Sequence, residues 1–408
     1  MDDVVTSGLP AFPMRRTCPL DPPHGYTALR AGQAISRVVL PTGKTAWLIM
    51  SHEYLRQILG DPRVSVNRTS PGYPHLIGVD PQSMGPIASI TNALVGLDPP
   101  EHAIHRRMII NEFTVRRLQA MRPRLQEITD GRINDLLGIG PPADLAEALS
   151  IPVPSLMICE LLGVPYGDHA AFQRYAHVAF GAKATPHDRF AAILELRAYL
   201  DKLVADKEGH PGDDLIGRLV VRYRDADIYD HEHMVGLATL LLIAGHETTA
   251  NMITLGTLAL MENPGQLAEI KRDPAVIPRA VDEILRYLSI ADAIGGARVA
   301  LDDIEIGGVV IRKGDGLIAL LSGANRDETV YGDPDTLDIR RGARQHVAFG
   351  YGIHQCLGQN LARMELEIVF GTLFKRIPEL RLAIPIEKLL FKDEMSGVYG
   401  LHEMPVTW

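Results

Sequence analysis

The chain has 408 residues, of which 46% are hydrophobic and 22% are charged, and its formal net charge is −9. This composition excludes a disordered or low-complexity chain. The excess of acidic residues argues against electrostatic binding of nucleic acid or anionic membranes by the protein's overall charge. The three cysteines, Cys18, Cys159 and Cys356, are too far apart in sequence for a disulfide framework or an all-cysteine zinc site.

The start of the chain argues against export. Residues 1–23 begin acidic, contain five prolines and have no apolar run behind a basic start. The longest strongly apolar run, residues 235–245, has eleven residues, fewer than the roughly 20 that cross a bilayer. We therefore expect a soluble, cytoplasmic protein that binds no membrane.

The predicted elements change character along the chain. Residues 35–50 are rich in β-branched and aromatic residues around a Pro-Thr-Gly turn and predict a hairpin. Residues 67–97 hold four prolines and four glycines, which predicts a long binding loop or mobile cover. Helix-like periodicity then dominates, until residues 298–321 alternate and turn like strands. After residue 381 the tail is again β-like.

These elements predict a mainly α fold with a small β region (α+β). We expect one large domain over residues 1–408, with a β-rich part at about 26–66 and a helical core at about 98–290.

The longest predicted helix spans residues 230–262, between a plausible N-cap at Asp230 and an Asn-Pro stop. Its middle is apolar on every side, so it should cross the protein interior. Polar residues 246–249 (HETT) interrupt this stretch, and because burial of polar groups is costly they need either hydrogen-bond partners or a function. In one interpretation, the Thr248 hydroxyl bonds to the preceding turn and Glu247 pairs with an arginine. A zinc motif H-E-x-x-H is excluded because its last position is Ala250.

A second cluster surrounds Cys356. Glycines stand at positions 350, 352 and 358, and a helix-like segment follows directly. A helix N-terminus stabilises a thiolate, and glycines permit close approach of something large and flat. A lone cysteine is otherwise most often a small buried hydrophobe.

These motifs resemble those of the cytochrome P450 family, over nearly the whole chain. Residues 349–358 (FGYGIHQCLG) fit the family's haem-binding loop, and residues 244–249 (AGHETT) fit its oxygen-activating motif. Glu283 and Arg286 fit its E-x-x-R signature. The finer resemblance is to actinobacterial members that hydroxylate macrolides, secosteroids, statin precursors and xenobiotics.

The resemblance implies haem b (iron protoporphyrin IX) as cofactor, with Cys356 as the axial thiolate ligand of iron. Glu247 and Thr248 would be catalytic and deliver protons to bound dioxygen. Glu283 and Arg286 would join Arg341 in a structural network. The residues implied to contact the haem or its propionates are His102, Arg106, Ala244, Arg298, Phe349, Gly350, His354, Cys356 and Gly358.

The resemblance also implies a substrate pocket walled by the 67–97 loop and the 166–195 region. The expected ligand is a medium-to-large lipophilic molecule, because most of the implied side chains are apolar. We expect the one acid nearby, Asp292, to face solvent. The implied substrate contacts are Leu94, Leu240, Ala244, Ile290, Ile294, Val398 and Tyr399.

No electron-transfer module is attached to the implied domain, so the resemblance implies a separate ferredoxin and ferredoxin reductase, serving a monomer. Residues 101–132 carry seven arginines against four acids, and Arg340 and Arg344 would extend this basic face. An acidic ferredoxin would dock there through opposite charge. An ordinary solvated helix face is the alternative.

Two other functions compete with a ferredoxin-dependent monooxygenase. A peroxide-driven peroxygenase or a nitric oxide reductase on the same fold would not need the Glu247-Thr248 pair, whose presence argues against both. A haem-binding sensor without turnover would not need the thiolate, the proton-relay pair and the propionate anchors together.

Overall fold

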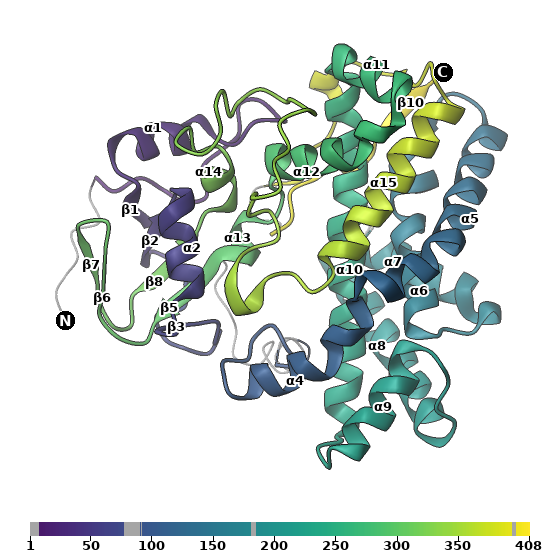
Figure 1. The fold of residues 1–408 in the computed structure, drawn as a ribbon, viewed down its shortest axis with the longest axis horizontal. Coiled ribbons are helices and arrows are strands. Elements are labelled where there is room, and N and C mark those ends of the chain that lie inside the picture. Colours follow the sequence, from purple (N-terminus) through teal and green to yellow (C-terminus); the bar gives the residue numbers. More distant parts are fainter. Residues whose placement is uncertain (1–7, 77–89, 91, 181–184, 394–396) are drawn as a thin grey trace. The chain divides into compact units, whose positions relative to one another are not determined.

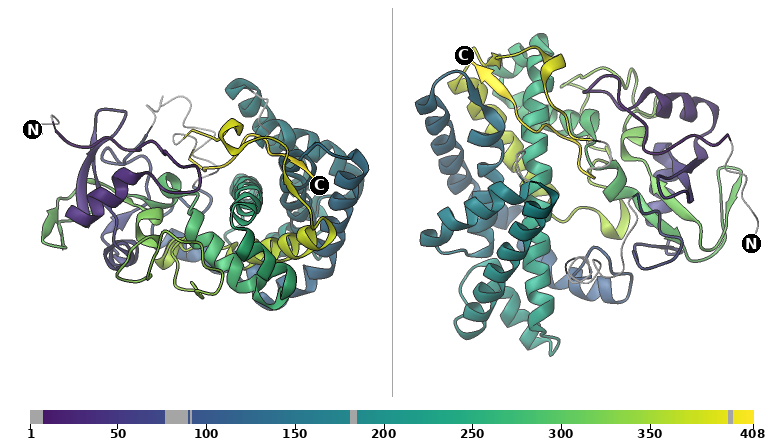
Figure 2. Two further views of the ribbon diagram at one scale, coloured as in Figure 1. Left: turned by 90° about the horizontal axis from the view of Figure 1, so that it is seen from above. Right: turned by 180° about the vertical axis from the view of Figure 1, so that it is seen from behind.

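The computed structural model describes residues 8–76, 90, 92–180, 185–393 and 397–408. The chain forms two compact units (Figures 1 and 2), each built from separate stretches of sequence. The first unit comprises residues 1–84, 279–356 and 392–399, and the second comprises residues 85–278, 357–391 and 400–408.

A five-stranded sheet forms the centre of the first unit, in the order β1-β2-β8-β5-β3. The predicted hairpin is β1 and β2, paired antiparallel from Ile35 opposite Ile49 to Val39 opposite Thr45. β2 pairs with β8 in parallel, and the other neighbours are antiparallel. The strands of this unit are β1 (Ile35–Val39), β2 (Thr45–Ile49), β3 (Val64–Ser65), β5 (Ala297–Ala300), β6 (Ile304–Ile306), β7 (Val309–Ile311) and β8 (Gly316–Ala319).

This unit also contains short helices. They are α1 (His24–Gly32), α2 (His52–Gly60), α12 (Ile277–Leu288, which begins in the second unit), α13 (Asp292–Gly296) and α14 (Leu321–Asn325). Leu55 and Ile58, one helical turn apart on α2, pack against Ile49 and Leu317 of the sheet in one apolar cluster. The predicted β-rich part at 26–66 therefore contains two helices besides its three strands.

The second unit is mostly helical. Its helices are α4 (Glu101–Ile109), α5 (Val115–Ile139), α6 (Pro152–Leu162), α7 (His169–Phe180), α8 (Pro186–Gly209), α9 (Leu215–Asp225), α10 (His231–Met261), α11 (Pro264–Arg272) and α15 (Gln359–Arg376). The β-like tail supplies β9 (Arg381–Leu382) and β10 (Pro405–Thr407), and β10 pairs with both β9 and β4 (Ala143–Asp144) in a small sheet.

Helix α10 confirms the predicted long helix. The Asp230 carboxylate accepts the N–H of His233 at 2.7 Å and caps its first turn. Most of its 31 residues are buried, and α6, α8 and α15 of the same unit pack against it. Among the residues that the structure describes, no helix is both long and apolar enough to cross a membrane.

The predicted loop at 67–97 falls partly outside the described residues, because 77–89 and 91 are not among them. Its role as a cover stays a prediction. The strands predicted at 298–321 are confirmed as β5 to β8.

Candidate active site

The loop before Cys356 is held by its own backbone. The N–H of Cys356 donates to the Phe349 carbonyl at 2.9 Å, and that of Gly350 donates to the Val347 carbonyl at 2.8 Å. Gly350 and Gly352 have φ of 70° and 76°, which side-chain-bearing residues rarely adopt. At Gly352 a Cβ would also collide with the Leu59 carbonyl. The glycine pattern therefore builds a tight turn that ends at the cysteine.

Among the three cysteines, Cys356 is the exposed one. Cys159 is fully buried, and burial raises the pKa of its thiol. Helix α15 begins three residues after Cys356, with Gly358 as its N-cap residue. Cys356 is thus an exposed thiol at the end of the glycine turn, and its role as a metal ligand stays a prediction.

The middle of α10 has an accessible face. Ala244 is exposed, and Glu247 and Thr248 are half-buried, whereas His246 and Thr249 are buried. Positions i, i+3 and i+4 lie on one side of a helix. Ala244, Glu247 and Thr248 therefore form a single patch on a helix whose residues are mostly buried, and this patch carries the predicted catalytic pair.

The Thr248 hydroxyl donates to the carbonyl of Ala244 at 2.8 Å, so the bond to the preceding turn is present. This bond uses the hydroxyl hydrogen and leaves the oxygen free to accept one. One turn on, the Asn251 side-chain amide donates to the Glu247 carbonyl at 2.8 Å. Side chains thus hold the carbonyls of Ala244 and Glu247, which lie about one turn apart.

The four predicted propionate-binding residues occur in both units. His102 and Arg106 lie one turn apart on α4 in the second unit. Burial, together with the Arg106 charge, lowers the pKa of His102 to about 4, so its imidazole is neutral at pH 7. In the first unit, Arg298 on β5 donates to the carbonyl of Ala297 at 2.8 Å, which fixes the direction of its side chain. His354 lies in the one-turn helix η5 (Gly352–His354) just before Cys356.

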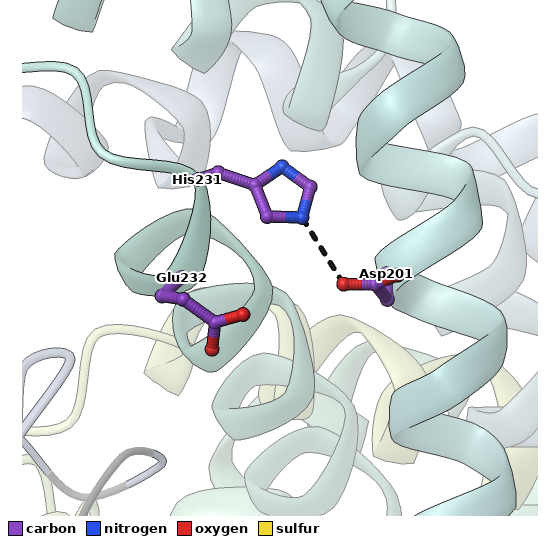
Figure 3. A group of neighbouring side chains, drawn as sticks. All are labelled: Asp201, His231 and Glu232. Carbon is purple, nitrogen blue, oxygen red and sulfur yellow. Dashed lines mark hydrogen bonds and ion pairs between the residues drawn. The ribbon is translucent and has the colours of Figure 1, made fainter.

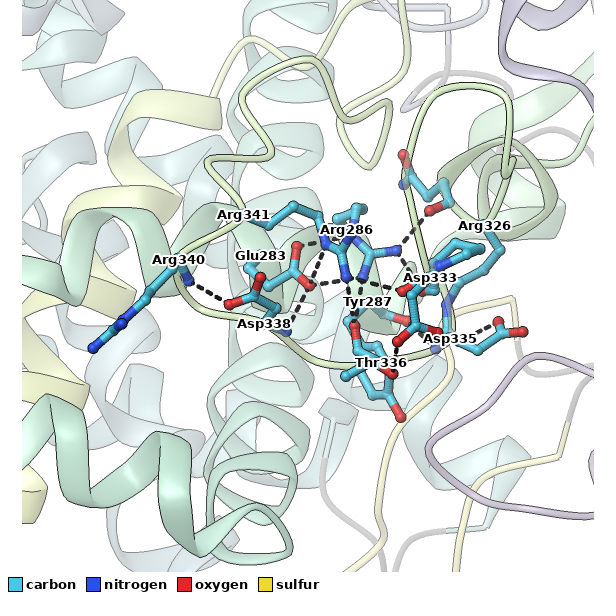
Figure 4. A network of polar contacts seen from close by, with 12 residues as sticks. Glu283, Arg286, Tyr287, Arg326, Asp333, Asp335, Thr336, Asp338, Arg340 and Arg341 are labelled. Atoms are coloured by element: carbon cyan, nitrogen blue, oxygen red, sulfur yellow. Dashed lines mark hydrogen bonds and ion pairs between the residues drawn. The ribbon is translucent and has the colours of Figure 1, made fainter.

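The predicted Glu283–Arg286–Arg341 network is confirmed (Figure 4). Arg286 donates to both carboxylate oxygens of Glu283, at 2.7 and 2.8 Å, and both side chains are fully buried. Arg341 adds a contact to the same carboxylate at 3.1 Å. Arg286 also donates to the carbonyls of Asn325 and Pro334, at 2.8 Å each. The network fixes the segment that leads to the Cys356 loop.

The predicted substrate contacts are placed unevenly. Leu94 and Leu240 are buried in the second unit, and the Ile294 side chain is not among those that the structure describes. In the first unit, Tyr399 donates its backbone N–H to the Ile290 carbonyl at 2.8 Å. The structure therefore joins two of the predicted wall segments. Val398 beside them is buried.

The expectation that Asp292 faces solvent is wrong. Its carboxylate accepts the N–H of Ser322 at 2.6 Å, and burial raises its pKa. Asp292 lines a small cavity of about 40 Å³ together with Ile290 and Tyr399. The Arg16 guanidinium lies 4.0 Å from the centre of the Tyr399 ring. Sequence analysis missed Arg16, because the N-terminal segment carries no motif that points to it.

The basic stretch at 101–132 has less free charge than its composition indicates. Arg122, Arg124 and Arg132 form ion pairs with Glu367, Glu160 and Asp135, respectively. Arg117 contacts the buried Glu112, which Arg218 and Arg222 of α9 also hold. The exposed arginines of the stretch are Arg107 and Arg116. In the first unit, Arg340 is exposed and points away from the buried network (Figure 4).

One cluster of metal-ligand type was not predicted. Asp201 of α8 lies beside His231 and Glu232 of α10 (Figure 3), with ligand atoms within 4.8 Å of one another. Each group already has a protein partner. The ring nitrogens of His231 contact Glu208 at 2.7 Å and Asp201 at 3.1 Å, and Arg197 donates to Glu232 at 2.6 Å. The Glu208 and Asp201 carboxylates raise the pKa of His231. We interpret the cluster as a set of polar contacts that joins α8 to the start of α10.

Comparison with known proteins gives consistent matches. The family described as Cytochrome P450 matches residues 213–378. Vitamin D3 dihydroxylase of Streptomyces griseolus is 46% identical over 404 residues, which cover 99% of this chain and 98% of that protein.

Two solved structures are similar over almost their full length. Cytochrome P450 MoxA from Nonomuraea recticatena (CYP105) is 50% identical, with a TM-score of 0.92 and 98% of each chain covered. Mycinamicin VIII C21 methyl hydroxylase MycCI from Micromonospora griseorubida, solved with mycinamicin VIII bound, is 42% identical. Its TM-score is 0.88, with 98% of this chain and 100% of that chain covered. With the cysteine loop and the accessible face of α10, these matches establish that the chain belongs to the cytochrome P450 family, in its CYP105 group of actinobacterial hydroxylases.

Proposed function

We propose that this P450 monooxygenase works as one catalytic domain over residues 1–408. It inserts one oxygen atom of O₂ into a C–H bond of a medium-to-large lipophilic molecule. A separate ferredoxin supplies the two electrons. The observation that carries the proposal is the accessible patch on α10, which places the Glu247 carboxylate and the Thr248 hydroxyl on a mostly buried helix. Ionisable groups are retained at such places when they have a task.

The residues present fit a haem group. An exposed thiol at the end of a glycine turn suits the axial ligand of iron, and two histidines and two arginines suit the propionates. Cys356 would ligate the iron, and His102, Arg106, Arg298 and His354 would bind the propionates. Phe349, Gly350, Gly358 and Ala244 would border the ring. When bound, haem supplies the iron that activates dioxygen, and thiolate ligation favours O–O cleavage.

The chain's own residues supply the protons. The bond from Thr248 Oγ1 to the Ala244 carbonyl fixes the hydroxyl, whose oxygen then accepts a hydrogen bond from a water molecule. The Glu247 carboxyl is next to it on the same accessible face and exchanges protons with solvent. In this arrangement Glu247 delivers the proton, and Thr248 holds in place the water molecule that accepts it.

Changing Thr248 to alanine should uncouple turnover while leaving haem and substrate binding intact. Without the hydroxyl, proton delivery is no longer directed to the correct position. The reducing equivalents are then consumed in forming peroxide and water. We expect product per electron pair to fall by about tenfold or more, a smaller factor than the roughly 10²–10⁴-fold that general acid–base catalysis contributes to a rate. Product and peroxide are measured against NADH consumed.

Thr254→Ala is the matched control for this change. Thr254 makes the same bond to a carbonyl four residues earlier, at 2.9 Å, but it is buried away from the accessible patch. Its loss should leave the ratio of product to electrons unchanged. A Thr248→Ala enzyme with wild-type coupling would refute the proton-delivery role.

The proposed substrate class has two lines of support. The described side chains Leu94, Leu240 and Val398 are apolar and buried. One relative is named for vitamin D3, and another was solved with mycinamicin VIII. Both point to a large, mostly lipophilic molecule as the ligand of this chain.

Reversing the charge of Arg107 and Arg116 should slow reduction by ferredoxin. Both residues are exposed, and they flank the exposed apolar side chains of Ile110 and Val115. The double change to glutamate should reduce association by about tenfold at low salt, because opposite charge steers the encounter. Stopped-flow reduction at several ionic strengths measures this effect, since the Debye length is about 10 Å at 0.1 M.

Arg272→Glu is the matched control, since this exposed arginine ends α11, far from α4 in the same unit (Figure 1). Peroxide-supported turnover should stay unchanged in both the double variant and the control. Equal loss with ferredoxin and with peroxide would show that Arg107 and Arg116 support the fold and not docking.

A further inference from the structure

The N-terminal segment at residues 12–21 follows a fixed path in the first unit. The backbone N–H of Phe12 donates to the Val39 carbonyl at 2.8 Å, and that of Met14 donates to the Tyr26 hydroxyl at 3.1 Å. Phe12 is 2% exposed and belongs to an apolar cluster with Tyr26. A terminal segment without such contacts would fray, so these bonds fix the first half of the segment.

The other end of the segment is fixed at Asp21. Its carboxylate accepts the Tyr287 hydroxyl at 3.1 Å and lies 3.4 Å from the guanidinium of Arg326. Arg326 is 1% exposed, and its guanidinium also lies 4.1 Å from the centre of the Tyr287 ring. The segment is therefore anchored on both sides of Arg16.

Arg16 extends from this anchored segment to Tyr399. Its guanidinium donates to the Asp21 carbonyl at 2.6 Å, which fixes the direction of the side chain, and lies 4.0 Å from the centre of the Tyr399 ring. The face of an aromatic ring is negative and attracts such a cation. The Tyr399 hydroxyl donates to the Pro19 carbonyl at 2.9 Å. The same short segment thus holds both the face and the tip of this ring.

Arg16 also interacts with the second of the two joined wall segments. The backbone N–H of Tyr399 donates to the Ile290 carbonyl, and Asp292 lies two residues beyond Ile290. Burial raises the pKa of the Asp292 carboxyl, and the Arg16 charge is one of the influences that oppose this rise. One guanidinium therefore acts on both segments that carry the predicted substrate contacts Ile290 and Tyr399.

The small cavity among these side chains gives the Tyr399 ring little freedom. Arg16, Ile290, Asp292 and Tyr399 line this space of about 40 Å³. It has room for a few water molecules but is far too small for a lipophilic substrate. Removal of the Arg16 guanidinium would enlarge it, and the Tyr399 ring would then have space to turn.

We propose that Arg16 is a positioning residue that sets the shape of the substrate pocket by holding the Tyr399 ring. This inference rests on the proposed function of Ile290 and Tyr399 as substrate contacts. With the guanidinium in place, the ring keeps one orientation, and the lipophilic ligands that bind best are those that match it. Without the guanidinium the ring turns, so both the affinity and the choice of the hydroxylated carbon change.

The test measures ligand binding by the holoenzyme, from the shift of the iron from low to high spin, with vitamin D3 and mycinamicin VIII as probes. Arg16→Met keeps the length of the side chain and removes its charge. The Kd of vitamin D3 should rise by about tenfold, which matches a partly desolvated cation–π contact, and the proportions of products hydroxylated at different carbons should change. Haem content should stay unchanged, because Arg16 is not among the residues implied to contact the haem.

Arg15→Met is the matched control. Arg15 is the preceding residue and is exposed, so this variant removes an equal charge from the same segment. Its Kd and its product proportions should match those of the wild type. Arg16→Lys keeps a cation near the ring and should bind within about threefold of the wild-type Kd. Equal losses in Arg15→Met and Arg16→Met would indicate an effect of net charge and would overturn the inference.

A double-mutant cycle with Tyr399→Leu tests whether Arg16 acts through this ring. Tyr399→Leu should raise the Kd, and the further change Arg16→Met should then alter it by less than about twofold, because the effects of residues that act as a unit do not add. Tyr399→Phe removes only the bond to the Pro19 carbonyl and should shift the Kd in the same direction by a smaller factor.

Two kinds of failure are distinguishable in this cycle. Fully additive effects, or wild-type binding by Arg16→Met, would overturn the inference and leave Tyr399 as a substrate contact. Unchanged binding in Tyr399→Leu alone would instead refute the proposed contact, and the inference would fall with it.

Discussion

Cys356→Ala should lose the absorption band that the reduced, carbon monoxide-bound form of a haem-thiolate protein shows. Because Cys356 is the exposed thiol, at the end of a turn that two glycines of positive φ build, no other described cysteine can take its place. Monooxygenase activity should fall to the level of free haem, since the thiolate is what favours O–O cleavage. Cys356→His should retain haem, with the band moved to the position typical of an imidazole ligand.

Cys159→Ala provides the control for that change. Cys159 is fully buried, and the raised pKa of its thiol keeps it protonated, so its loss should affect packing but leave the thiolate band. An intact band in Cys356→Ala would refute the assignment of Cys356 as the ligand of the iron.

Arg286→Met should destabilise the protein by about 3–5 kcal/mol, because it leaves the fully buried Glu283 without its main partner. The loss of donors to the Asn325 and Pro334 carbonyls adds to this cost. The midpoint of urea unfolding and the haem content of the purified protein measure the effect. Both should fall together, since the network fixes the segment leading to Cys356.

Two further variants serve as comparisons for Arg286→Met. Replacing both partners, as Glu283→Leu with Arg286→Met, should recover part of the loss, because no buried charge is then left unpaired. Arg312→Met breaks an exposed pair with Asp303 and should cost about 1 kcal/mol or less. If Arg286→Met were as stable as Arg312→Met, the network would contribute little to the fold.

Features that depend on local sequence could be predicted. Helix α10 follows from the Asp230 cap and the apolar run, and the β1–β2 hairpin follows from its turn and its alternation. The pairing of Glu283 with Arg286 follows from their spacing of one helical turn. In each case the partners are near in sequence, so the pattern itself carries the geometry.

Features that depend on distant partners could not be predicted. A charge count treats Arg122 as free, yet its partner Glu367 lies 245 residues away. Asp292 was expected in solvent because nothing near it in sequence indicates the bond to Ser322. Glu365 has the charge of a surface residue within a helical pattern, and only the packing of α15 against α10 shows that it is buried.

The most direct test of the account is turnover under isotopically labelled dioxygen. The holoenzyme is first screened with secosteroids and macrolides for a ligand that shifts the iron from low to high spin. That ligand is then converted with ferredoxin, ferredoxin reductase and NADH. The account predicts a hydroxylated product that carries one labelled oxygen atom for each electron pair consumed. Product oxygen that comes from water, or product formed only when peroxide is added, would contradict it.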